Sequence, residues 1–412
     1  MAYVPTVSLE EELELIRRGA AEIFPEGELE RKVIRAREEG RPLRVKLGVD
    51  PTASDLHLGH MIPILKLKQF QDLGHQVILI IGDYTATVGD PSGRNKARPQ
   101  LSHEQVLEYA KHYEDQVFRI LDRERTEVVR NGEWLSKLTF ADVIRLLSTM
   151  TLARMLERED FANRYRSQVP ISLHELVYPL MQGYDSVMVR ADIELGGTDQ
   201  KFNILVGRDL QERAGMEPQV GICNPLLLGT DGKEKMSKSL GNTIALADPP
   251  EEMYGKVMSI PDDLMWMYFE LITDVPLAKV AELRRGVEEG SLHPKPVKQR
   301  LAREIVARFY GAEKAAGAEA YFDRVVTAGE IPDDVPEHRV LPDQLKEGRI
   351  WIVRLLVDAG LAASNGEARR LIVQGGVKIN GQPVTDASLD WPVQDGAVVQ
   401  AGKRKFARVR LG

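Results

Sequence analysis

Two short polar segments carry side chains suited to binding phosphate. In residues 50–60, His57 and His60 stand three residues apart on either side of Gly59. At the start of a helix, two such histidines can donate hydrogen bonds to phosphate oxygens, the helix N-terminus adds positive potential, and glycine lets a nucleotide approach the backbone. Residues 235–239 (KMSKS) place two lysines among small hydroxyl residues, as in a cationic loop that can close over a ligand. Both segments indicate a site that neutralises the charge of a reacting triphosphate.

The elements around these segments indicate an α/β sheet. Residues 44–49 and 76–82 are short apolar runs typical of buried parallel strands, and residues 58–73 between them have helical periodicity. Strand, crossover helix and strand predict a doubly wound parallel sheet, whose ligands bind beyond the carboxyl ends of the strands. Residues 50–60 and 89–94 lie near such ends, and the sequence contains no G-x-G-x-x-G dinucleotide fingerprint.

A polar stripe follows one face of a further predicted helix. Tyr178, Gln182 and Asp185 are spaced i, i+4 and i+7, with His174 beside them, while the opposite arc is apolar. By spacing alone, such a stripe is most often the solvent face of a helix. Pro179 would also kink any helix that contained it in its interior. A substrate pocket is the alternative that the spacing leaves open.

Composition indicates a large chain with unevenly distributed charge. The 412 residues predict two to four domains, and the single cysteine excludes an intrachain disulfide and a multi-cysteine zinc site. No apolar run is long enough to cross a membrane and the start is unlike a signal peptide, which predicts a cytoplasmic protein with no membrane partner. The net charge is −7, but ten basic and five acidic residues leave +5 within residues 349–412, so the remainder carries −12. One end is therefore expected to bind a polyanion.

The second half of the chain is predicted to be mainly helical and to end in a small mixed module. Helices dominate residues 104–184 and again residues 249–328, and the segment that follows is rich in proline and acidic residues, as linkers are. The tail combines helices near residues 351–359 and 364–373 with a hairpin. Its Asn380-Gly381 pair is a strong turn signal.

The two phosphate-binding segments, in this order, resemble the paired signature of class I aminoacyl-tRNA synthetases. The whole chain resembles the bacterial tyrosyl-tRNA synthetase family, in its longer type. The motifs that carry this resemblance are residues 48–52 (GVDPT) with 57–60 (HLGH), 89–93 (GDPSG), Tyr178 with 182–185 (QGYD), 196–200 (GGTDQ) and 235–239 (KMSKS). The tail resembles the alpha-L RNA-binding motif through residues 364–370 (SNGEARR) and 376–381 (GVKING).

The resemblance implies a fold and a division into domains. The fold is α/β, with a doubly wound parallel-sheet (Rossmann-like) catalytic domain over residues 1–245 that carries a helical insertion at about 100–170. An α-helical anticodon-side domain then covers residues 246–330, followed by a linker over residues 331–348. A small α+β RNA-binding domain covers residues 349–412.

The resemblance also implies a reaction, its partners and its site residues. L-Tyrosine and ATP would give tyrosyl-adenylate and pyrophosphate, and a homodimer would transfer tyrosine to the terminal adenosine of tRNA(Tyr). Mg²⁺ would accompany the ATP phosphates, with no tightly bound metal held by the protein.

The catalytic residues would be Thr52, His57, His60, Lys235 and Lys238. The tyrosine site would comprise Gly48, Asp50, Asp90, Tyr178, Gln182, Asp185 and Gln200, with Asp185 accepting a hydrogen bond from the phenol. ATP would be bound by Gly59, Gly197, Asp199 and Lys238, and pyrophosphate or the tRNA end by Arg94 and Arg98. RNA would be bound by Arg369, Arg370, Lys378, Lys403, Arg404 and Lys405.

Lys46 and Glu194 depart from the pattern of many family members. A tyrosine that also bonds the substrate phenol commonly stands at the position of Lys46, and a glutamine is common at that of Glu194 in the shorter type. Another residue or a water is therefore expected to make the second phenol contact. Two rivals remain: a tryptophanyl-tRNA synthetase, because a buried Asp185 accepts from an indole as well, and a non-enzymatic RNA-binding protein with a degenerate synthetase body. The tail module counts against the first rival, and the intact histidine and lysine motifs count against the second.

Overall fold

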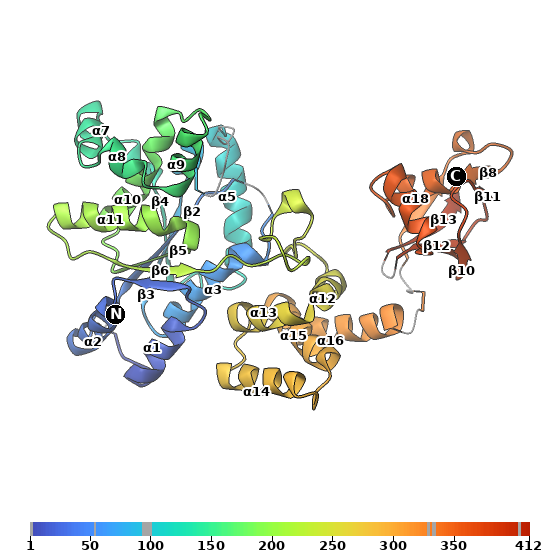
Figure 1. Ribbon diagram of the computed structural model, residues 1–412, viewed down its shortest axis with the longest axis horizontal. Helices are drawn as coiled ribbons and strands as arrows, with labels where there is room; N and C mark the ends of the chain where they lie inside the picture. The colour runs from blue at the N-terminus through green and yellow to red at the C-terminus, as the bar shows by residue number, and fades with distance from the viewer. Residues whose placement is uncertain (1–2, 53–54, 93–100, 328–329, 332–334, 403–404) are drawn as a thin grey trace. The chain divides into compact units, whose positions relative to one another are not determined.

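The chain folds into two compact units, Met1–Ala312 and Glu313–Gly412 (Figure 1). The computed structural model describes residues 3–52, 55–92, 101–327, 330–331, 335–402 and 405–412. Lys403 and Arg404, predicted to bind RNA, and Arg94 and Arg98 lie outside the described residues. The domain boundaries expected after residues 245, 330 and 348 stay predictions.

A six-stranded sheet forms the centre of the first unit. Its order is β1-β6-β5-β2-β3-β4, and only the edge strand β1 runs antiparallel to its neighbour. The inner strands are near-continuous apolar runs because helices cover both faces of the sheet. The strands are β1 (Glu22–Phe24), β2 (Arg44–Val49), β3 (Gln76–Ile81), β4 (Thr126–Arg130), β5 (Ile193–Gly197) and β6 (Val220–Asn224).

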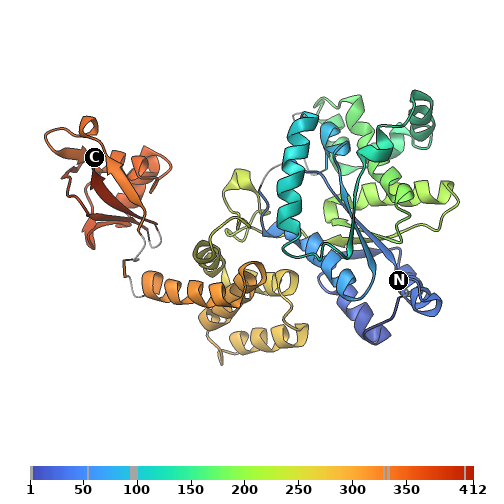
Figure 2. The same ribbon diagram turned by 180° about the vertical axis from the view of Figure 1, so that it is seen from behind.

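Helices on the two faces of this sheet confirm the predicted doubly wound α/β fold. Helix α3 (Leu58–Asp72) joins β2 to β3 and packs on one face, while α10 (Tyr178–Met188) and α11 (Lys201–Arg213) cover the other, as Figures 1 and 2 show. Gly74 follows α3 with φ +92°, a conformation that favours glycine. The other helices of this part are α1 (Leu9–Arg17), α2 (Glu28–Glu39), α4 (Thr85–Val88), α5 (His103–Val117), α6 (Gly132–Leu135), α7 (Phe140–Leu147), α8 (Leu152–Met155) and α9 (Glu159–Arg166).

Two local features differ from the sequence-based expectation. The segment expected to be mainly helical, residues 104–184, contains β4, which pairs with β3 as the second edge of the sheet. All five residues of β4 are only partly buried, so its sequence lacks the apolar run that marks β2 and β3. Pro179 does not kink α10, because this helix begins at Tyr178 and the proline occupies its first turn, where its missing N–H is not needed.

The region after the lysine loop is helical, as predicted. Helix α13 packs against α3 of the sheet domain, and α12 packs against α15. None of the helices in the described residues combines the length and the apolar character needed to cross a membrane. The helices are α12 (Pro250–Ser259), α13 (Met265–Ile272), α14 (Leu277–Glu288), α15 (Pro294–Tyr310) and α16 (Ala312–Tyr321), with a π-helical stretch at Phe322–Thr327.

The second unit is a small α+β module. Its five-stranded sheet has the order β10-β9-β12-β13-β7, and helices α17 (Ile352–Asp358) and α18 (Asn365–Val373) share an apolar core with one face of it. The predicted hairpin turn is present, with positive φ at Asn380 and Gly381. The strands are β7 (Glu337–Val340), β8 (Arg349–Trp351), β9 (Val377–Ile379), β10 (Gln382–Val384), β11 (Asp390–Pro392), β12 (Val398–Ala401) and β13 (Lys405–Leu411).

Part of the expected linker belongs to this sheet. Residues 331–348 include β7, which pairs in parallel with β13. Val335 also packs with Val325, Val398 and Phe406. This four-residue strand is flanked by proline and acidic residues, which is the composition of a linker. Because its partner strand lies some 70 residues later, the local sequence does not predict the pairing.

Candidate active site

A cavity of about 300 Å³ opens at the carboxyl ends of β2 and β5, where a doubly wound sheet binds its ligands. Its volume is at the lower end of those found for small-molecule sites. Most of the predicted site residues line it, namely Gly48, Asp50, Thr52, Gly59, His60, Asp90, Tyr178, Gln182, Asp185, Gly197, Asp199 and Gln200. The polar stripe of α10 therefore lines a cavity and is not the solvent face of the helix.

The two histidines lie at the N-terminus of α3. The backbone N–H of His57 donates to Nδ1 of His60 at 3.2 Å, and the two ring centroids are 3.7 Å apart. Because Nδ1 of His60 accepts, the proton of the neutral ring is on Nε2, which can donate to a ligand. A Cβ on Gly59 would lie 3.1 Å from the His57 ring, so glycine at this position lets the ring approach the helix backbone.

Both histidines are held in the neutral form. Burial, followed by the charges of His60 and Lys238, lowers the pKa of His57 to about 3. Burial, followed by the charge of Lys238, lowers the pKa of His60 to about 4. Nδ1 of His57 is buried and has no hydrogen-bond partner among the described residues. Neutral rings at pH 7 can bind phosphate by hydrogen bonding without adding charge.

The lysine loop lies beside the cavity and does not line it. Lys235 and Lys238 are exposed, and Nζ of Lys238 lies 3.3 Å from Oδ2 of Asp55, also exposed. The base of the loop is fixed by buried Asn242, whose Oδ1 accepts from the N–H of Ser237 at 2.8 Å. The loop thus has an anchored base and two lysines exposed to solvent near the histidines.

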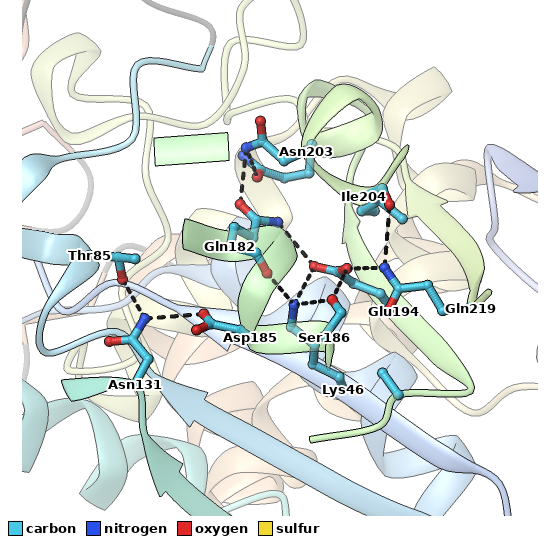
Figure 3. Close-up of polar contacts among 12 residues, drawn as sticks. Lys46, Thr85, Asn131, Gln182, Asp185, Ser186, Glu194, Asn203, Ile204 and Gln219 are labelled. Carbon is cyan, nitrogen blue, oxygen red and sulfur yellow. Dashed lines mark hydrogen bonds and ion pairs between the residues drawn. The ribbon is translucent and has the colours of Figure 1, made fainter. Parts of the chain in front are cut away.

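Asp185 forms the polar end of the cavity on the side of α10. It is 3% exposed, and each carboxylate oxygen accepts a hydrogen bond: Oδ1 from Nε1 of Trp134 at 2.8 Å and Oδ2 from Nδ2 of Asn131 at 3.1 Å. Burial raises the pKa of Asp185 to about 7, opposed by the charge of Lys46 and by these two donors. Figure 3 shows Asn131 between Asp185 and Thr85. The carboxylate is therefore oriented for accepting a hydrogen bond from a ligand.

Sequence reasoning missed Asn131, Trp134 and Thr85. Asn131 also donates to Oγ1 of Thr85 at 2.9 Å, and Thr85 donates to Oδ1 of Asp50 at 2.7 Å. Tyr178 donates to the other oxygen of Asp50 at 2.8 Å. Asn131 and Trp134 follow β4, so recognising that strand would have placed them at the same edge of the sheet as Asp50.

Asp90 and the two glutamines lie on a second side of the cavity. Gln200 donates through Nε2 to Oδ2 of Asp90 at 2.8 Å, and the N–H of Ser92 donates to Oδ1 of Asp90 at 2.9 Å. Asp199 lies nearby. Desolvation of its carboxylate, followed by the charge of Asp90, raises the pKa of Asp199. These groups make the side acceptor-rich, as a site for an ammonium group or for ribose hydroxyls should be.

The four predicted RNA-binding residues of the tail that the structure describes are exposed but do not share one face. Arg369 and Arg370 lie on α18, and the Arg369 guanidinium lies 5.2 Å from the centre of the Trp351 ring. Lys405 and Val377 are in register across the strand that lies between theirs, so their side chains are on the same face of the sheet. The side chain of Val377 is in the core shared with α18. Lys378 is the next residue after Val377 in β9, so its side chain points to the opposite face of the sheet.

Two family models match the chain. The one described as tRNA synthetases class I (W and Y) matches residues 38–327, and the one described as S4 domain matches residues 350–399. The chain is 55% identical to the tyrosine–tRNA ligase of Moorella thermoacetica over 398 residues, which is 97% of this chain and 95% of that protein. It is 52% identical to the tyrosine–tRNA ligase of Carboxydothermus hydrogenoformans over 407 residues, covering 98% and 99%.

A solved structure agrees with these relatives. The crystal structure of tyrosyl-tRNA synthetase complexed with L-tyrosine from Archaeoglobus fulgidus matches with a TM-score of 0.62 at 27% identity, covering 76% of this chain and 100% of that one. The fold and the first family model define a class I synthetase of the tryptophan and tyrosine group. The relatives narrow this further: the chain belongs to the bacterial tyrosyl-tRNA synthetase family, whose members form aminoacyl-tRNA, and the two rival interpretations fall away.

Proposed function

We propose that this cavity activates L-tyrosine with ATP and that its two polar ends divide the substrates between them. The chain is a tyrosine–tRNA ligase by its family. The observation that carries the assignment is that one cavity is lined both by Asp185, held by two N–H donors, and by His60, which stacks beside His57 at the N-terminus of α3. Asp185 accepts the phenol O–H of tyrosine. His57 and His60 donate to the phosphates of ATP.

The first step is adenylation. A carboxylate oxygen of tyrosine attacks the α-phosphorus of ATP, the bond from that phosphorus to the bridging oxygen of pyrophosphate breaks, and pyrophosphate leaves with the electron pair. His60 donates through Nε2–H to the phosphoryl oxygens as negative charge grows there, and Thr52 assists. Lys235 and Lys238 close over the leaving group, because only a movement of their loop brings both ammonium groups to the triphosphate. Gly59, Gly197 and Asp199 hold the adenosine.

The second step transfers tyrosine to RNA. A ribose hydroxyl of the terminal adenosine of tRNA(Tyr) attacks the carbonyl carbon of the adenylate, and AMP leaves. Mg²⁺ enters with ATP, since it is a hard cation that prefers phosphate oxygens and water. We assign the ligands of Mg²⁺ to these phosphate oxygens and to water. We also assign the enzyme to the cytoplasm, where its tRNA is found.

The test of this function is ATP–pyrophosphate exchange with each of the 20 amino acids. Exchange that depends on tyrosine, with little from phenylalanine or tryptophan, supports the assignment of Asp185. Exchange that prefers tryptophan would contradict it, as would the absence of exchange with every amino acid.

Lys238→Ala should slow adenylation by about two orders of magnitude while leaving tyrosine affinity nearly unchanged. A charge that reaches the phosphates only in the transition state contributes to the rate and not to ground-state binding. Pre-steady-state formation of tyrosyl-adenylate measures both quantities. Lys233→Ala is the matched control, because Lys233 is an exposed lysine of the same loop. Weaker tyrosine binding with an intact chemical step would make the loop a structural element.

We further propose that the enzyme is a homodimer joined through α7. This helix exposes an apolar stripe at i, i+4 and i+7, where Phe140, Ile144 and Leu147 are 80%, 51% and 40% exposed. A contiguous apolar patch of this kind is costly on a free surface and is typical of an interface. A second copy of the chain is the occupant that the family leads us to expect.

Phe140→Asp should convert the dimer to a monomer at micromolar concentration. An aspartate in an apolar interface is desolvated without a partner, which costs several kcal/mol. Sedimentation velocity gives the mass of the species. Val373→Asp is the control, because Val373 is exposed to a similar extent on α18 of the other unit. A Phe140→Asp protein that remains a dimer would place the interface elsewhere.

A further inference from the structure

A buried ion pair lies beneath the cavity without lining it. Nζ of Lys46 lies 2.9 Å from Oε1 of Glu194, and their side chains are 0% and 1% exposed. Lys46 therefore has no surface on the cavity that we propose binds the phenol. Burying two charges costs several kcal/mol each, so such a pair is weak evidence for stability alone and suggests another role.

The donor and the acceptor of each hydrogen bond around this pair are fixed by chemistry. The ammonium group of Lys46 has three donors, and it donates to the backbone oxygen of Gln182 at 3.0 Å, to Oγ of Ser186 at 2.7 Å and to Glu194. Because Ser186 accepts from Lys46, its own proton goes to Oε2 of Glu194, at 2.9 Å. A carboxylate accepts and does not donate, so the side chain of Gln182 must present its NH₂ group, at 3.0 Å, to Oε1 of Glu194 (Figure 3).

The orientation of Gln182 is passed on through Asn203. With its NH₂ group on Glu194, Gln182 turns its carbonyl oxygen to Nδ2 of Asn203, at 3.0 Å. The same nitrogen donates to the carbonyl oxygen of Gln200, also at 3.0 Å, which leaves the NH₂ group of Gln200 for Asp90. Asn203 is itself oriented by Arg158, which donates to its Oδ1 at 3.1 Å. One NH₂ group thus gathers two glutamine oxygens on the same side of the cavity as Asp90.

We propose that Glu194, held by Lys46, is a positioning residue that orients the Gln182 amide, so that Gln182, Gln200 and Asp90 together accept the α-ammonium group of tyrosine. This inference rests on the proposed function. An ammonium group only donates, so it needs acceptors on every side. A carbonyl oxygen can accept two hydrogen bonds, so each glutamine oxygen can receive one from Asn203 and another from the substrate. Gln182 turned the other way would meet the substrate with N–H groups.

The test compares a double variant, Lys46→Met with Glu194→Gln, with the wild type. Glutamine keeps the shape of Glu194 but can donate or accept, so it no longer fixes the Gln182 amide. Replacing Lys46 at the same time avoids leaving a buried charge without a partner. Three ligands are titrated as substrate or inhibitors of exchange: L-tyrosine, tyramine, which lacks the carboxylate, and 3-(4-hydroxyphenyl)propanoate, which lacks the ammonium group.

We expect the double variant to bind tyrosine and tyramine roughly tenfold to a hundredfold more weakly, the size of effect associated with hydrogen bonds to a charged group. The propanoate should bind as it does to wild type, and kcat at saturating tyrosine should stay within a few-fold. Asn203→Leu leaves the Lys46–Glu194 pair intact but removes the donor to the carbonyl oxygen of Gln182, so it should give the same pattern. It replaces the double variant in the test if that protein does not fold. Glu127→Gln is the matched control. Glu127 pairs at 3.3 Å with Arg44, which lies on β2 as Lys46 does, and this pair is away from the cavity.

Equal weakening of all three ligands would show a merely structural role and overturn the proposal, as would unchanged binding of tyrosine and tyramine. Failure of the proposed function looks different, because the wild type itself would then lack tyrosine-dependent exchange.

Discussion

Asp185→Asn should lower the selectivity for tyrosine over phenylalanine by two orders of magnitude or more. In the wild type, phenylalanine leaves a buried carboxylate without its ligand hydrogen bond, at a cost of about 3 kcal/mol or more, and each 1.4 kcal/mol is a factor of ten. Asparagine also turns an NH₂ group toward Trp134 or Asn131, both donors in this structure. The loss should therefore fall on kcat/KM for tyrosine, with phenylalanine little affected, in competitive exchange with both amino acids.

The pH dependence of selectivity gives a second measurement of this prediction. The pKa of Asp185 is raised to about 7, so the carboxylate is mostly protonated below pH 7 and mostly ionised above it. Only the ionised form is a pure acceptor for the phenol, so selectivity should rise with pH through about 7 in the wild type. It should be flat in Asp185→Asn. Asp192→Asn, whose carboxylate pairs with Arg41 away from the cavity, is the control. Unchanged selectivity in Asp185→Asn would remove this residue from the phenol site.

The parts of the site that the sequence predicted are those with a local signal. His57 and His60 are three residues apart at a helix start, soon after an apolar strand, so their place at the carboxyl end of that strand follows from a short stretch of sequence. The doubly wound sheet follows similarly from the apolar runs of β2 and β3. By contrast, the stripe of α10 was ambiguous, because spacing shows which residues share a helix face but not what covers that face.

The parts that the sequence did not predict depend on pairings between distant segments. Asn131 and Trp134 reach Asp185 only because β4, a partly polar edge strand, aligns with β3. Lys46 meets Glu194 because β2 and β5 are in register at these two residues, almost 150 positions apart in the chain. Neither contact has a local signal, and a lysine within an apolar strand gives no indication of its partner.

The proposed roles would separate specificity from catalysis in this cavity. The proposed phenol and ammonium ends lie on strands and helices of the sheet domain, held by hydrogen bonds through Asn131, Trp134 and Asn203. The lysines proposed to act on the triphosphate lie on an exposed loop anchored by Asn242. Rigid elements suit the discrimination between similar side chains, whereas a loop suits a charge needed only in the transition state.

Removing the second unit should separate the two half-reactions. A cut after Glu347 would leave β7 without β13 and expose Val325 and Val335, so the better cut is after Ala312, where the second compact unit begins. The sheet, the cavity and the lysine loop all precede this cut. We therefore expect residues 1–312 to retain tyrosine-dependent exchange within a few-fold and to lose tRNA charging by about two orders of magnitude or more.

The charge of the tail gives this prediction its physical basis and its control. Each phosphate contact contributes slightly less than one unit to the slope of log K against log salt, so losing Arg369, Arg370 and Lys405 should make that slope shallower by about 2 to 3. In the full chain, Arg369→Ala with Arg370→Ala should weaken tRNA binding, whereas Lys378→Ala, on the opposite face of the sheet, reports whether that face takes part. Filter binding at several salt concentrations measures the slopes, and aminoacylation measures charging. If residues 1–312 charge tRNA(Tyr) as well as the full chain, the basic tail is not the module that binds tRNA.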